Sequence, residues 1–232
     1  MRPILEYFSK EKISSIDEYV KQASNFYFPR VINEYLSTKI VQSKIKATDE
    51  TIHKIVLSEI KRLGNDADLN HIDVSEVTNM QHLFMCDTYG QFSPKTGLNP
   101  DISKWNMIKV ENTRCMFLGC ESFNGDLSDW DFENLEDIGA MFYGCKKFNS
   151  NLNNWNTGAL RLMAQAFACC DLFNQPLNHW DVSNVEYMRQ TFFNCKSFNQ
   201  DISKWNVKKV KSCEEIFDGC PIKEEFKPKF KK

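Results

Sequence analysis

The sequence lacks an apolar run of about 18 residues, the length that a membrane-spanning helix requires. Its first residues, MRPILEYFSKEK, also lack the apolar stretch of a secretory signal, so we expect a cytoplasmic protein without a membrane span. The formal net charge is only −2. Residues 71–220 carry 19 acidic and 13 basic side chains, and this balance disfavours contacts with nucleic-acid phosphates.

The sequence also lacks the motifs that mark common catalytic sites. No G-x-S-x-G, H-E-x-x-H, G-x-G-x-x-G or phosphate-loop pattern occurs, and the four histidines stand at unrelated positions. No C-x-x-C pair or Cys/His cluster has zinc spacing. Paired catalytic carboxylates at Asp129 and Asp131, or calcium bound by these and Asp126, are the remaining options, although regular calcium-binding repeats are missing. We therefore predict no enzyme, no cofactor and no metal.

What the sequence does contain is a repeat of 25 residues. The five tryptophans are spaced at this interval throughout, and phenylalanine and cysteine form further columns with the same period. The columns are Trp105, Trp130, Trp155, Trp180, Trp205; Phe117, Phe142, Phe167, Phe192, Phe217; and Cys120, Cys145, Cys170, Cys195, Cys220. A fixed period of 20–50 residues is typical of solenoids, whose units bury their apolar faces against their neighbours. Reduced, buried thiols are the simplest reading of the cysteine column, and a ladder of disulfides is the alternative.

The repeat units resemble a known family. DISKWNMIKVENTRCMFLGCESFNG and DVSNVEYMRQTFFNCKSFNQ are similar to the BspA-type leucine-rich repeats, surface-protein repeats also described as a domain of unknown function first noted in mycoplasmas. The resemblance covers roughly residues 49 to 220 and includes the I-x-x-W-[ND], V-x-x-M and M-F-x-G-C-x-x-F-N blocks in order. It implies a repeat solenoid that is used for binding, and it implies no reaction.

Each repeat divides into two expected elements. Ile102 and its equivalents, followed by tryptophan, predict a short strand, and the segment from Val185 through Met188 to Phe192 predicts a short helix. We therefore predict an α/β fold: a right-handed, leucine-rich-repeat-like solenoid of about six strand–helix repeats. An asparagine follows a phenylalanine in four repeats, and we expect these buried amides to bridge adjacent coils as a structural ladder with the tryptophans. These residues are Asn124, Asn149, Asn174 and Asn199.

Three regions are predicted along the chain. Residues 1–47 form an N-terminal helical region, in which Ser15 to Glu18 has capping-box spacing. Residues 48–220 form the solenoid, which includes a capping helix over 48–64 that starts at Thr48 and stops at Gly64. Residues 221–232 form a basic tail. The first repeat contains a surplus of eight residues within 87–100, and we expect this stretch to be a surface loop that either binds a partner or is a tolerated insertion.

Repeats that keep their core residues and vary their outward residues offer a binding surface. The first candidate is the strand face, which contains Ser103, Ser128, Asn153, Asn178, Ser203 and, beside them, Lys104, Asp129, Asn154, His179, Lys204. The second is the helical side, with Glu111, Glu136, Arg161, Glu186 and Lys211. We favour the strand face because strands line the concave surface of leucine-rich-repeat proteins.

The predicted function is a non-enzymatic protein-interaction scaffold whose partner is an unidentified protein. Two alternatives stay open. Residues 28–36 are faintly similar to an F-box, which suggests an adaptor that recruits a second protein. Exported relatives of the BspA type suggest a surface or host-attachment protein. Pro221 and the lysines after it discourage strand pairing at the exposed end, so we expect a monomer.

Overall fold

The computed structural model describes residues 44–86 and 97–230. The chain divides into two units, residues 1–44 and 45–232, and the account below concerns the second unit. The predicted N-terminal helices, the F-box-like segment and most of the predicted 87–100 loop lie outside the described residues. The division falls three residues before the expected boundary at 47/48. The reason is that residues 45 and 46 pair with residues 72 and 73 and so belong to the second unit.

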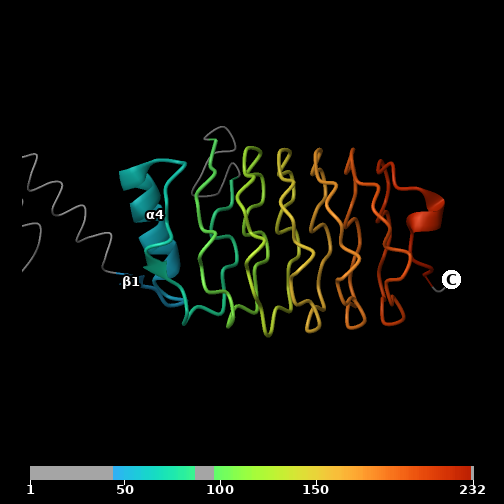
Figure 1. Cartoon of the computed structure of the whole chain (residues 1–232), viewed down its shortest axis with the longest axis horizontal. Coiled ribbons are helices and arrows are strands. Elements are labelled where there is room, and N and C mark those ends of the chain that lie inside the picture. Colours follow the sequence, from blue (N-terminus) through green and yellow to red (C-terminus); the bar gives the residue numbers. More distant parts are fainter. Residues whose placement is uncertain (1–43, 87–96, 231–232) are drawn as a thin grey trace, which may run out of the picture. The chain divides into compact units, whose positions relative to one another are not determined.

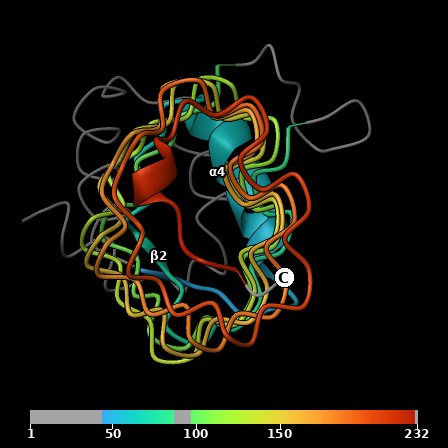
Figure 2. The same cartoon turned by 90° about the vertical axis from the view of Figure 1, so that its right-hand side faces the viewer.

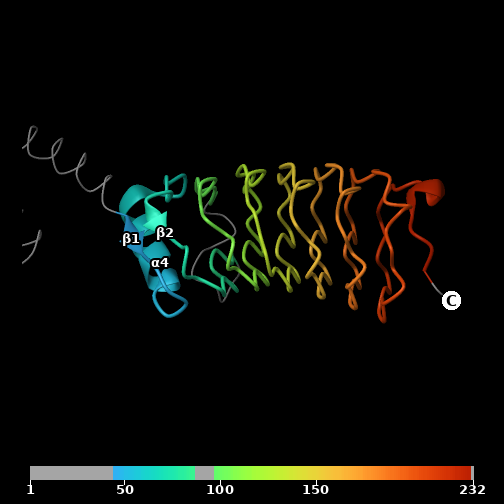
Figure 3. The same cartoon turned by 60° about the horizontal axis from the view of Figure 1, so that its bottom comes forward.

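The second unit is a row of stacked coils that starts at a short parallel sheet and a helix (Figures 1 and 3). Strand β1, Ile45–Lys46, pairs in parallel with strand β2, Ile72–Asp73. Between them lies helix α4, Ile52–Leu63, which buries Ile52, Val56 and Ile60. A short 3-10 helix, η2, spans Glu224–Phe226 at the other end. Successive coils lie one above the other, so the row is seen end-on as a ring in Figure 2.

Helix α4 begins later than predicted. Thr48 was expected to cap it, but the helix cap is Thr51, and residues 48–51 form a turn in which the Ile52 N–H reaches the Thr48 carbonyl at 2.9 Å. The Thr51 hydroxyl accepts the Thr48 N–H at 2.9 Å and so holds this turn closed ahead of the helix. Gly64 ends the helix with φ +95°, a conformation that favours glycine.

Apart from strand β2 in the first repeat, the described repeats contain neither the strand nor the helix that we expected in each of them. Adjacent coils are joined by isolated parallel bridges through Asn79, Asn112, Asp137, Leu162, Tyr187 and Ser212, and the rest of each described coil consists of turns. A helix needs N–H groups that bond four residues back, but here alternate N–H groups bond the next coil instead. The N–H groups of Cys115 and Phe117, for example, donate to the carbonyls of Gly139 and Met141, both at 2.9 Å. Apolar spacings of three and four therefore mark turns here.

The interior is built from aromatic columns. Phe84, Phe117, Phe142, Phe167, Phe192 and Phe217 stack with ring centroids 5.3–5.9 Å apart. Phe123, Phe148, Phe173 and Phe198 form a parallel stack at 5.9 Å. All five tryptophans are at most 6% exposed, and Trp130, Trp155 and Trp180 stack at 6.0 and 6.1 Å. Every indole also donates its N–H to a carbonyl of the preceding coil, at 2.8–3.1 Å.

The cysteine column is also internal. None of the nine cysteines forms a disulfide in the described part of the chain, and Cys120, Cys145, Cys170 and Cys195 are buried. Each of these four lies within 3.1 Å of the carbonyl oxygen of a phenylalanine in the preceding coil, so the thiol can act as a weak donor between coils. Burial raises the pKa of these thiols well above the usual value, which keeps them protonated and unreactive.

The asparagine column links the coils, but not as buried amides. The side-chain oxygens of Asn99, Asn124, Asn149 and Asn174 each accept the backbone N–H of the next asparagine at 2.8–2.9 Å, and Asn199 accepts the Lys223 N–H at 3.0 Å. The expectation of burial is wrong, since Asn124, Asn149 and Asn174 are exposed. Asn99 was not predicted as a member, because leucine replaces the preceding phenylalanine.

We expect Asn174→Ala to lower the free energy of unfolding by only about 0.5–1.5 kcal/mol, because water can replace the lost acceptor at an exposed site. The lost bonds are those to the Asn199 N–H at 2.9 Å and the Gln200 side chain at 3.0 Å. Denaturant unfolding measures the change. Asn154→Ala is the control, because this exposed amide makes no side-chain hydrogen bond among the described residues. Equal stabilities for the two variants would remove the ladder as a source of stability.

Candidate binding surface

The strand-face residues are held outward by a turn that recurs in the coils. The side chain of Asp101 accepts the Ser103 N–H at 3.0 Å, and Asp126, Asn151 and Asp201 do the same two residues ahead of Ser128, Asn153 and Ser203. The tryptophan two residues after Ser103, Ser128, Asn153 or Ser203 points inward and is buried. The residue between the two, such as Lys104, is therefore directed to solvent. In the remaining coil Pro176 occupies the place of the turn-forming side chain.

This arrangement brings the predicted strand-face residues together in two adjacent columns. Lys104, Asp129, Asn154, His179 and Lys204 are all exposed. The inner column is half-buried at Ser103, Ser128, Asn153 and Ser203, and exposed at Asn178. In the described part of the chain, the side chains of the five exposed residues make no hydrogen bond or ion pair. Two grooves lie beside Trp205: one of about 330 Å³ includes Pro176, Asn178 and Lys204, and one of about 370 Å³ includes Ser203 and Lys208.

The second predicted column differs because three of its five charged residues, Arg161, Glu186 and Lys211, form ion pairs with one another. Glu186 accepts ion pairs from Arg161 at 3.0 Å and from Lys211 at 2.5 Å. Glu111, Glu136 and Arg161 line a shallow groove of about 400 Å³ with Asp137, whose carboxyl has its pKa raised by burial. A partner on this side would have to compete with existing ion pairs.

Two of the histidines take part in closing the first end of the stack. The His53 ring nitrogen lies 3.0 Å from the Gln81 carbonyl, and His71 Nε2 lies 2.9 Å from the Glu59 carboxylate. The carboxylate of Asp49 accepts the N–H groups of Thr78 and Asn79 at 2.7 and 3.0 Å. In later coils the two equivalent N–H groups donate to one backbone carbonyl of the preceding coil. In the first coil the Asp49 carboxylate takes the place of that carbonyl.

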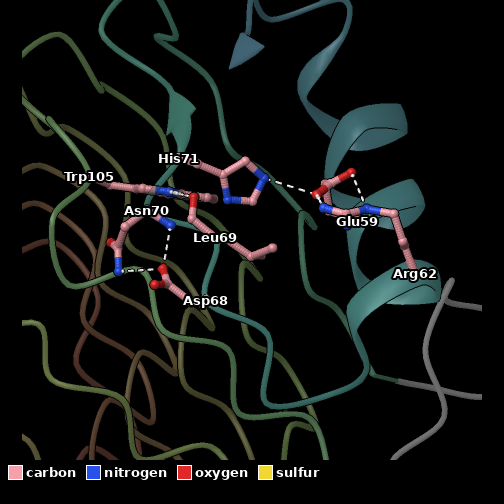
Figure 4. A network of polar contacts seen from close by, with 7 residues as sticks. All are labelled: Glu59, Arg62, Asp68, Leu69, Asn70, His71 and Trp105. Carbon is pink, nitrogen blue, oxygen red and sulfur yellow. Dashed lines mark hydrogen bonds and ion pairs between the residues drawn. The ribbon is translucent and has the colours of Figure 1, made fainter. Parts of the chain in front are cut away.

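Glu59 is the buried charge of this end, 8% exposed on helix α4 (Figure 4). It pairs with Arg62 one turn later and with His71 beside β2. Next to His71, Asp68 accepts the Asn70 N–H at 2.9 Å, and the Leu69 carbonyl accepts the Trp105 indole at 3.0 Å. The cluster therefore connects α4 to the first tryptophan, and its polar groups are already satisfied. Among the described residues no group of three His, Cys, Asp or Glu side chains could hold a metal ion.

The Glu59 cluster predicts a pH dependence of stability. The hydrogen bond from Arg62 lowers the pKa of Glu59 below its usual value, and the bond from His71 acts in the same direction. The contribution to stability should therefore be complete above the unfolded-state pKa of about 4.3 and be lost as pH falls through the folded-state pKa. We expect the free energy of unfolding of the parent to exceed that of Glu59→Gln at neutral pH, and the difference to shrink on acidification. A difference that is constant from pH 7 to pH 3 would contradict this.

The family model described as mycoplasma protein of unknown function, DUF285, matches residues 55–145 and 127–229, which together exceed half of the chain. The chain belongs to this family. No curated protein and no solved structure matches the chain. Taken together, the two DUF285 matches run from within helix α4 to the C-terminal segment. They therefore include both candidate columns and the aromatic interior. None of the helices in the described ranges is both long and apolar enough to cross a membrane.

Sequence reasoning found the residues of both columns but missed the polar closure of the stack. Asp49 lies just before helix α4, where a carboxylate usually interacts with the N-terminal end of the helix, but its partners lie 29 and 30 residues away. An acidic residue just before an amphipathic helix could interact with the helix end or with a neighbouring coil. Only the spacing of the coils could have suggested the contact with Thr78 and Asn79. The C-terminal segment was also missed: Ile222 is 6% exposed, and Phe226 and Phe230 pack against the core. Its apolar residues, spaced four apart, were the available signal.

Proposed function

We propose that the stack is a right-handed solenoid of the BspA leucine-rich-repeat type that serves as a non-enzymatic scaffold for binding another protein. The observation that carries this proposal is the column of Lys104, Asp129, Asn154, His179 and Lys204. Its side chains are exposed, aligned by the coils, and without hydrogen bonds or ion pairs to other described residues. A partner could pair with these groups without first breaking contacts inside the protein, whereas Arg161, Glu186 and Lys211 of the second column are already paired.

The chemical variety of this column supports recognition of a protein surface. It combines two lysines, one aspartate, one asparagine and one histidine on a fixed backbone. Varied side chains on rigid supports give specificity, because each wrong partner meets an unpaired or repelled charge at some position.

A paired charge reversal tests the proposed surface. We expect the double variant Lys104→Glu, Lys204→Glu to lose a partner that is captured by the parent protein in affinity purification. The control is Lys54→Glu, Lys147→Glu, which makes the same change in charge at exposed lysines that lie outside the column and make no ion pair. Circular dichroism and unfolding verify that both variants remain folded. Retention of the partner by the first variant, or its loss from both, would exclude this surface.

A further inference from the structure

The last coil of the stack ends in a row of backbone donors. In the coil before it, the N–H groups of four alternate residues donate to carbonyls of the last coil: Met188 to Ser212, Gln190 to Glu214, Phe192 to Ile216 and Asn194 to Asp218, at 2.7–3.0 Å. The corresponding N–H groups of the last coil belong to Cys213, Glu215, Phe217 and Gly219. No acceptor for these four is found within the described residues, because residues 220–230 do not form a further coil over them.

The C-terminal segment closes only the opposite side of this coil. The Lys223 N–H donates to Asn199 Oδ1 at 3.0 Å, and the Phe226 carbonyl accepts the Ile202 N–H at 3.0 Å. Residues 223–226 thus take the place of part of a further coil beside Asn199 and Ile202. Lys227 extends its ammonium over the Phe217 ring, 5.6 Å from the centroid, without bonding the backbone edge. The edge over residues 213–219 is left open.

The direction of the hydrogen bonds argues against a second copy of the chain as the occupant. Two last coils placed end to end would bring donors against donors. The complementary carbonyls lie at the other end of the stack, where His53 of α4 already occupies the Gln81 carbonyl and the helix packs its apolar residues on the first coil (Figure 1). Pairing of the two ends would require displacement of α4. An extended segment of another protein can instead supply carbonyls at every second residue.

The charge on the edge indicates the side chains of that segment. Glu214, Glu215 and Asp218 are exposed along the open edge, and none of them forms an ion pair with a described residue. Two acidic groups of earlier coils, Glu121 and Asp171, have lysine partners at 2.8 and 2.9 Å. The Ser212 hydroxyl and the Gln190 side-chain amide already donate hydrogen bonds to Glu214 and Glu215, so these carboxylates lack a cation rather than a partner. A segment with lysine or arginine side chains would supply positive charge beside all three carboxylates.

We propose that the open edge of the last coil, residues 213–219, binds an extended basic segment of a partner protein, which pairs in parallel with the four free N–H groups. This site is separate from the exposed column that runs from Lys104 to Lys204. Binding at one site does not depend on binding at the other. The parallel direction follows that of the existing coils, which pair in parallel with one another, and the three carboxylates select for basic side chains.

Amide hydrogen exchange measured by NMR tests the pairing directly. In the free protein, the amides of residues 213, 215, 217 and 219 should exchange at least about tenfold faster than those of 188, 190, 192 and 194, which occupy the same places one coil earlier. The probe is an acetylated, amidated peptide of sequence KVKTKVKTK. On its addition the four edge amides should become protected while the interior four stay unchanged. Protection at another surface, no protection at saturation, or equal exchange in the free protein would overturn the proposal.

A triple charge reversal tests the selection of basic side chains. Glu214→Lys, Glu215→Lys, Asp218→Lys should weaken peptide binding, measured by calorimetry, by about tenfold or more. The control is Glu50→Lys, Asp66→Lys, Glu133→Lys, which changes the net charge by the same amount at exposed residues that lie away from the edge and form no ion pair. This control should bind the peptide as the parent does. Equal affinity for both variants, or concentration-dependent dimers of the parent in sedimentation, would overturn the assignment.

Discussion

Replacing Trp155 with alanine should lower the free energy of unfolding by about 3–5 kcal/mol, the usual range for loss of a large buried aromatic side chain. Trp155 is 3% exposed and stacks between Trp130 and Trp180, at 6.0 and 6.1 Å. Its ring also meets Phe132 edge-on at 5.0 Å. The neighbouring coils are fixed by backbone bonds on several sides, so they cannot collapse into the vacated space. Denaturant unfolding followed by circular dichroism measures the loss.

Trp155→Phe separates the packing contribution from that of the hydrogen bond. Phenylalanine retains most of the apolar surface but cannot donate to the Leu127 carbonyl, which the indole N–H reaches at 2.9 Å. That carbonyl keeps its backbone bond from the Trp130 N–H at 3.2 Å, so we expect the lost indole bond to cost only about 0.5–1.5 kcal/mol. Similar losses for the phenylalanine and alanine variants would show that filling the space contributes little.

The 25-residue period predicted which side chains are buried, but the spacing of apolar residues within a coil did not predict the backbone conformation. A residue that recurs every 25 positions must occupy the same place in each coil, so the burial of the tryptophan and phenylalanine columns followed from spacing alone. Spacing within a coil was a poor guide to backbone conformation. Val185, Met188 and Phe192 fit a helix, yet Gln190 between them has φ +54° and Asn194 just after them also has φ +54°. Two left-handed residues so close together exclude both helix and strand.

Polar contacts between coils were predictable only in part. The asparagine column was found because it recurs, but burial could not be derived from recurrence, and these amides lie at the surface. Asp49 and the segment from Ile222 to Phe230 act once each, at the two ends of the stack, so no repeat reveals them. For the binding surface, the sequence identified both outward columns, and the ion pairs of Glu186 are what distinguish them.

The left-handed positions lead to the second large expected effect. Gly119 and Gly144 occupy the same place in consecutive coils, with φ +74° and +73°. Cys169 and Asn194 occupy that place in the next two coils with φ +60° and +54°, so a side chain there is tolerated at some cost in backbone strain. We expect Gly144→Ala to lower the free energy of unfolding by about 1–2 kcal/mol, because an added Cβ would meet nothing closer than 3.7 Å.

Gly119→Ala should be far more damaging. Its added Cβ would lie 2.0 Å from the backbone oxygen of Cys86, which cannot move alone because the Cys86 N–H is bonded to the Leu118 carbonyl at 2.7 Å. The contact between these two coils must therefore open, which adds the cost of overpacking to that of the left-handed conformation, in total about 2–5 kcal/mol. Thermal or denaturant unfolding of both variants measures the difference. If Gly119→Ala were no less stable than Gly144→Ala, then the close approach of Cys86 would not be what requires glycine at this position.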